Sequence, residues 1–169
     1  MTRHLLSRGH AVTAVDNSAE MLSHVPSEAR KVESNIEDLH LGRQFDVVLL
    51  ASCLINTPDD SLRAAQLRAC RKHVSARGCL ICERFDPKWL RGVEMGPGAP
   101  LGDIAFSVER VLREGNLVEL SLRYSTKEED WRQHFTARIL DETDVLQAVS
   151  EADFSTLEWI NRRWAAARP

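Results

Sequence analysis

The sequence predicts an α/β fold in which helices cover a mostly parallel sheet, with antiparallel strands toward the C-terminus. Two observations predict it. Up to residue 85, short apolar segments typical of buried strands alternate with segments of helical periodicity. After a stretch rich in Gly and Pro at 88–102, segments 106–113 and 117–124 flank a tight Glu-Gly-Asn turn, as paired antiparallel strands do. A length of 169 residues fits one domain, so residues 1–169 are interpreted as a single domain.

Four strands and three helices are predicted in the first half of the chain. The strands are predicted at residues 11–15, 31–34, 45–50 and 79–85. Residues 11–15 are apolar nearly throughout, as in a strand that is covered on both faces. Residues 2–8 have the pattern of a helix end, closed by a glycine. Asn17 or Ser18 can cap the second helix. The third helix is predicted to start within Thr57-Pro58-Asp59-Asp60, with the Thr57 hydroxyl as its cap and Pro58 at its first position, and to end at Gly78.

The second half is predicted to add one more long strand, a helix and a short strand. Residues 131–140 are the strand candidate, and the acidic segment 141–144 begins a helix that runs through Glu151. Residues 154–159 form the last short strand. The basic tail from Asn161 is expected to fray.

Composition and charge exclude several classes of function. The net charge is −3, from 22 basic and 25 acidic residues, and no segment is strongly basic, which argues against a nucleic-acid partner. No apolar run approaches the ~20 residues that span a bilayer, and the N-terminal apolar stretch is too short for a secretory signal. We therefore expect a cytoplasmic protein with a small-molecule substrate and no membrane partner.

Cys79 and Cys82 have the C-x-x-C spacing of some zinc and redox sites. They lie in a predicted strand, however, where positions three apart point to opposite faces, so one metal could not bind both. We expect them to be small core residues, and no metal site is predicted.

The candidate ligand-binding residues follow the predicted strands, because open parallel sheets bind ligands beyond the C-terminal ends of their strands. Asp16 could accept two hydrogen bonds from a ribose diol, or could cap the next helix. Asn35 could bond an adenine edge while Ile36 packs on the ring, or both could lie in a solvated loop. Ala51 and Ser52 are small enough to let a ligand approach the backbone, or they could be ordinary loop residues.

Further candidates depend on weaker patterns. Asn17 and Met21 are grouped with the cofactor-binding residues, although a methionine one helical turn beyond the acid could equally lie in the core. Glu83 and Asp86 could face a substrate or form surface ion pairs. His134 could be a base or an ordinary packed histidine. No catalytic residue can be assigned from these patterns.

Taken in order, these segments resemble class I S-adenosylmethionine-dependent methyltransferases of the small bacterial type. The segments that carry the resemblance are residues 10–22, 35–39, 45–52, 78–84 and 131–142. It implies a Rossmann-like fold and methyl transfer from S-adenosylmethionine to a small-molecule acceptor. It also implies that Asp16 binds the ribose, that Asn35 and Ile36 bind adenine, and that Ala51 and Ser52 form the wall near the methyl group.

One part of the family pattern is missing from this sequence. The family's first strand and its glycine-rich G-x-G-x-G loop are absent, and residues 2–8 resemble the end of the helix that follows that loop. We expect an N-terminally truncated domain. The alternatives are a strand supplied by a partner chain or homo-oligomer, and a sheet closed by pairing the strands at 11–15 and 45–50 directly. Two other functions stay open: a non-catalytic degenerate methyltransferase that acts as a binding partner, and a nicotinamide-dependent oxidoreductase.

Overall fold

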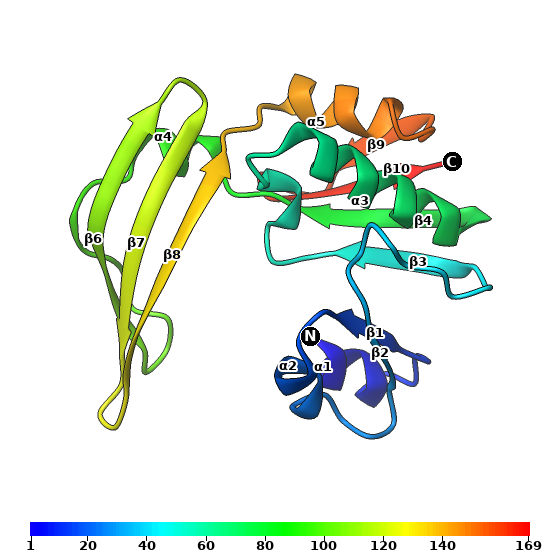
Figure 1. Ribbon diagram of the computed structural model, residues 1–169, viewed down its shortest axis with the longest axis horizontal. Helices are drawn as coiled ribbons and strands as arrows, with labels where there is room; N and C mark the ends of the chain where they lie inside the picture. Colours follow the sequence, from blue (N-terminus) through cyan, green and yellow to red (C-terminus); the bar gives the residue numbers. More distant parts are fainter.

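The computed structural model describes residues 1–169, which form an α/β chain with three separate sheets (Figure 1). The first sheet has two parallel strands, β1 (Thr13–Asp16) and β2 (Arg30–Glu33). The helices α1 (Thr2–Ser7) and α2 (Ala19–Ser23) belong to this part of the chain. Ser18 caps α2, because its Oγ accepts a hydrogen bond from the Met21 amide.

The second sheet has the strand order β3-β4-β10-β9. Its strands are β3 (Phe45–Leu50), β4 (Val74–Glu83), β9 (Thr156–Trp159) and β10 (Trp164–Arg168). β3 and β4 are parallel, whereas β10 runs antiparallel to both of its neighbours. The 3-10 turn η1 (Leu54–Asn56) and the helices α3 (Asp60–His73) and α5 (Glu142–Ser150) complete this part. The main core lies here, around fully buried residues such as Leu67, Leu80 and Val145.

The third sheet is antiparallel throughout and has the order β5-β6-β7-β8. Its strands are β5 (Gly96–Pro97), β6 (Ala105–Glu114), β7 (Leu117–Ser125) and β8 (Asp130–Arg138). The helix α4 (Pro87–Gly92) packs Leu90 into a second core with Val118 and Leu120. Figure 1 shows this sheet beside the C-terminal ends of β3 and β4.

The region around α3 differs from the sequence prediction at both ends. The N-cap is Asp59, not Thr57, and its Oδ1 accepts hydrogen bonds from two amides of the first turn. The helix ends at His73, and Gly78 lies inside β4 rather than at the helix end. A Cβ on Gly78 would stand 2.7 Å from the Asp46 carbonyl oxygen, so this glycine allows a close approach between strands.

The tail from Asn161 does not fray, and that prediction is wrong. It forms β10, an interior strand of the second sheet, in which Ala165 and Ala167 are fully buried. Alternate small apolar residues fit the tight space between the sheet and its covering helices. The strand was missed because it is short and follows two arginines.

The alternative in which the strand at 11–15 pairs directly with the strand at 45–50 is wrong, because β1 hydrogen-bonds only to β2. Cys82 is buried in the main core and Cys79 is half-buried on the other face of β4. No cluster of three or more His, Cys, Asp or Glu side chains has the arrangement of a metal site. None of the helices combines the length and the apolar character needed to cross a bilayer.

Candidate functional site

A cavity of about 770 Å³ lies between β1 and β3, and it brings four of the predicted site residues together. Asp16, Ile36, Ala51 and Ser52 line it, each at or just beyond the C-terminal end of a strand. The inner part of the cavity is lined by both strands themselves and is mainly apolar. The position at the strand ends is where open parallel sheets bind ligands.

Asp16 is the acidic residue of this site, and the alternative that it caps the next helix is wrong, because the N-cap of α2 is Ser18. The side chain is half-buried at the end of β1. Its Oδ1 accepts a hydrogen bond of 2.9 Å from the Ser18 amide, which helps to shape the turn into α2. Its Oδ2 accepts no hydrogen bond from the protein, so one carboxylate oxygen remains for a ligand hydroxyl.

Asn17 and Asn35 lie beside each other but do not line the cavity. The Asn17 side-chain amide donates to Asn35 Oδ1 at 3.0 Å, and Asn35 Nδ2 donates to Asp38 at 3.4 Å. Both asparagines are exposed, whereas Ile36 is half-buried and packs against the main core. Met21 is 57 % exposed and also lies outside the cavity lining, so the alternative that placed it in the core is wrong.

The loop after β3 has an uncommon backbone. Ser52 and Cys53 both adopt left-handed conformations, with φ of 58° and 56°. Two consecutive non-glycine residues in this region store strain of order 1–3 kcal/mol each, which surrounding contacts must offset. One such contact is visible: the Ser52 amide donates a 2.9 Å hydrogen bond to Glu83 Oε2.

Glu83 forms an ion pair with the exposed Arg163, as one of its two predicted alternatives held, but the acid itself is largely buried. The residue is only 9 % exposed at the end of β4. Its second oxygen accepts a hydrogen bond of 2.6 Å from Arg163, which lies just before β10. Charge-assisted hydrogen bonds of this kind hold a buried carboxylate in a defined position. The acid thus ties the strained loop after β3 to the C-terminal strand.

Burial also determines the chemistry of the neighbouring Cys53. Burial is the largest cause and the nearby charge of Glu83 a smaller one, and together, against the opposite effect of Arg163, they raise the pKa of the Cys53 thiol to about 11. The thiol is protonated at neutral pH and is a poor nucleophile. This argues against covalent catalysis by Cys53.

A family model described as a methyltransferase domain matches residues 1–82, which include β1, β2, β3 and most of β4. Residues 1–82 are thus similar to the methyltransferase domain family. A search of curated proteins found no match to the chain.

Solved methyltransferases share the fold over nearly the whole chain. A S-adenosylmethionine-dependent methyltransferase from Clostridium acetobutylicum ATCC 824 superposes with a TM-score of 0.79 at 16 % identity, covering 98 % of this chain and 77 % of its own. The sugar N-methyltransferase KedS8 from Streptoalloteichus sp. ATCC 53650 has a TM-score of 0.75 at 18 % sequence identity, and the match covers 98 % of this chain and 74 % of KedS8. The amino pentose methyltransferase CalS10 from Micromonospora echinaspora has a TM-score of 0.74 at 17 % sequence identity, and the match covers 99 % of this chain and 78 % of CalS10. The chain thus has the Rossmann-like methyltransferase fold.

Two side chains of the methyltransferase fold were missed by the sequence analysis. Arg163 lies in the tail that was predicted to fray, and the three consecutive alanines that follow Trp164 do not by themselves favour a strand. Asn56 is only 2 % exposed and links three segments. Its Nδ2 donates to the Arg138 carbonyl at 2.8 Å, and its Oδ1 accepts from the Phe85 amide at 2.9 Å. Nothing in its local sequence distinguishes it from a residue that starts the next helix.

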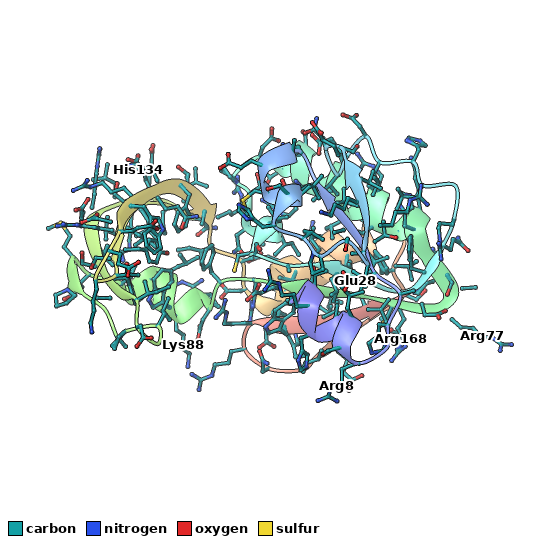
Figure 2. The ribbon with its side chains drawn as sticks, turned by 90° about the horizontal axis from the view of Figure 1, so that it is seen from below. Arg8, Glu28, Arg77, Lys88, His134 and Arg168 are labelled. Atoms are coloured by element: carbon teal, nitrogen blue, oxygen red, sulfur yellow. The ribbon has the colours of Figure 1, made fainter.

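The remaining predicted residues lie outside the cavity. Asp86 caps α4 by accepting a hydrogen bond from the Lys88 amide at 2.8 Å, so it is not a surface ion pair. Its predicted substrate role stays a prediction. His134 is exposed on the third sheet, where its Nδ1 lies 2.7 Å from Ser121 Oγ. Figure 2 shows His134 far from Arg8 at the end of α1, and His134 does not line the cavity.

Proposed function

We propose that this methyltransferase-fold chain transfers a methyl group from S-adenosylmethionine to a small-molecule acceptor. The observation that carries the proposal is the shared cavity rim formed by Asp16, Ile36, Ala51 and Ser52. It supports an adenosine-binding site because it combines a carboxylate with a free oxygen, an apolar side chain and small backbone-exposing residues.

The residues at the rim fit the adenosine half of the cofactor. Asp16 Oδ2 is available for a ribose hydroxyl, and Ile36 offers an apolar surface for the adenine ring. Asn35 would have to exchange its present partners, Asn17 and Asp38, to bond an adenine edge. When bound, the cofactor supplies a methyl group on a sulfonium, a good leaving group, so the protein's task is mainly to position the acceptor.

The loop after β3 supports this positioning role. Glu83 holds the Ser52 amide, and Arg163 holds Glu83, so the Ala51-Ser52 wall is fixed from the far side of the sheet. Two proteins of similar fold are named for methylation of a sugar and of an amino pentose. These names support a small polar acceptor such as an amino sugar.

A calorimetric titration of S-adenosylhomocysteine into the 169-residue chain tests the proposal. We expect binding with a Kd of about 10–100 μM and an Asp16→Asn variant that binds at least ~10-fold more weakly, or about 1.4 kcal/mol. Glu20→Gln is the matched control, because Glu20 is an exposed acid on α2 outside the cavity. A chain that unfolds cooperatively but binds no S-adenosylhomocysteine would overturn the proposal and favour the non-catalytic partner protein.

A further inference from the structure

We propose that His73 is a positioning residue of the cavity between β1 and β3. Its neutral imidazole holds residues 34–44, which we call the connecting segment, against α3, and protonation of the ring releases that segment. The effect of this release on cofactor binding rests on the proposed function, whereas the hydrogen bond of His73 and its response to pH do not.

The connecting segment joins the first sheet to the second. It lies between β2 and β3, and Figure 1 shows the chain passing from one sheet to the other along it. The segment also forms part of the cavity wall, since Ile36 and Leu41 line the cavity and Ile36 packs against the main core. The path of the connecting segment therefore determines where Asp16 and Ile36 lie relative to Ser52.

A single hydrogen bond links residues 1–44 to residues 45–169. The Leu41 amide donates it to His73 Nε2 over a distance of 3.1 Å. No other hydrogen bond crosses between these two parts, no strand of the first sheet pairs with a strand of the other sheets, and no ion pair joins the two parts. The remaining contact includes the apolar packing of Ile36, which is not directional. The bond from Leu41 to His73 thus fixes the connecting segment against α3.

The hydrogen-bond partners of His73 define the protonation state of its ring. His73 lies in the last turn of α3 and is only 6 % exposed. Its Nδ1 lies 2.7 Å from the carbonyl oxygen of Ala69, which can only accept, so Nδ1 carries the proton. The Leu41 amide can only donate, so Nε2 carries none. The bonded ring is therefore neutral and is held in one tautomer.

Protonation of His73 is incompatible with its bond to Leu41. An imidazolium carries an N–H on both ring nitrogens, so Nε2–H would point at the Leu41 N–H and the two groups would have to separate. The C-terminal end of α3 favours a cation, whereas burial of the ring opposes it. The other titratable or charged residues that line the cavity, from every element beside α3 and from α3 itself, are His10, Asp16, Arg43, Asp46 and Cys70. None of these five forms a hydrogen bond or an ion pair with His73 in this structure, so none replaces Leu41 as its partner.

The first test follows the full chain by NMR without any cofactor. Nitrogen-15 spectra of the histidine rings identify the tautomer of His73, and a titration from pH 7.5 to 5.0 follows this ring together with the Leu41 amide. We expect the Nδ1–H tautomer at pH 7.5. As the ring gains its second proton, the hydrogen-exchange protection factor of the Leu41 amide should fall at least about fivefold, as expected for the loss of one net hydrogen bond. An Nε2–H tautomer, or a Leu41 amide that does not respond to the ring, would overturn the proposal.

Two variants separate the charge of the ring from its packing. In His73→Gln, the side-chain amide oxygen can still accept from Leu41 but does not titrate, so the protection of the Leu41 amide should become independent of pH. His40→Gln is the matched control, because His40 is an exposed histidine of the connecting segment, lies outside the cavity lining and bonds only to the Asp38 carbonyl. Its titration should match that of the parent protein. A pH response that persists in His73→Gln would assign the transition to another group and overturn the proposal.

Calorimetric titration of S-adenosylhomocysteine at pH 7.5 and 5.5 then tests the positioning role. We expect the Kd to rise at least about fivefold at the lower pH in the parent protein and in His40→Gln, and by less than about twofold in His73→Gln. Equal affinities at both pH values in the parent, despite the release of Leu41, would overturn the positioning role. No binding at either pH, with the NMR transition present, would uphold the pH-dependent bond and overturn the proposed function instead.

Discussion

Replacing Ala166 by proline tests whether the last residues of the chain are a structural part of the second sheet. Ala166 is the central residue of β10 and pairs with Ile81 of β4 on one side and Glu158 of β9 on the other. Proline has no N–H, so it removes a ladder hydrogen bond, and its ring does not fit an interior strand.

The expected cost follows from these losses. The missing hydrogen bond accounts for about 1 kcal/mol, and the carbonyl left without a partner adds about 1–3 kcal/mol. We therefore expect Ala166→Pro to lower the free energy of unfolding by about 3 kcal/mol, out of about 5–15 kcal/mol for a typical domain. For a chain of this size, that corresponds to a fall in Tm of about 6–12 °C.

Thermal unfolding followed by circular dichroism and calorimetry measures this effect. Ala166→Val is the matched control, because residue 166 is half-buried and a β-branched side chain suits a strand. We expect the valine variant to stay within about 0.5 kcal/mol of the parent protein. If both variants unfold within about 1 °C of the parent, the last residues contribute nothing to the sheet and the reasoning is refuted.

Two further predictions concern pH and thiol reactivity. The Arg91 guanidinium donates hydrogen bonds of 3.0 and 2.5 Å to Asp141 and holds the pKa of Asp141 below its usual range. The ion pair therefore stabilises the fold above about pH 4. This stabilisation is lost as the pH falls through the lowered pKa. Since both side chains are about half exposed, Arg91→Gln should cost less than about 1 kcal/mol at pH 7 in urea unfolding and nothing near pH 2, and an equal cost at both would contradict this. Burial raises the pKa of three of the four thiols to about 11 or 12. Iodoacetamide at pH 8 should therefore modify the half-buried Cys79 first. The Cys79→Ser variant should lack this fast phase of thiol modification, measured by mass spectrometry. Rapid modification of a second thiol in the folded Cys79→Ser protein would show that burial does not protect the others.

The amino-acid sequence by itself determined the local features of this protein. The strand at Phe45–Leu50 and the position of Asp16 at a strand end were predicted correctly, and Ser18 is one of the two predicted cap candidates for α2. Each of these features depends on residues adjacent in the chain. The same local patterns placed Ile36 and Ser52 beyond strand ends, and the structure brings both to the cavity that Asp16 lines.

Only the tertiary structure decided the rest, because it depends on contacts between distant segments. The local sequence around Glu83 does not show its hydrogen bond with Arg163, because Arg163 lies 80 residues further along the chain. The tail looked frayed because an isolated five-residue strand has no stability of its own, and β10 exists only through its pairing with β4 and β9. The cavity between β1 and β3 is likewise a result of strand pairing, since a strand's own sequence does not specify its neighbours.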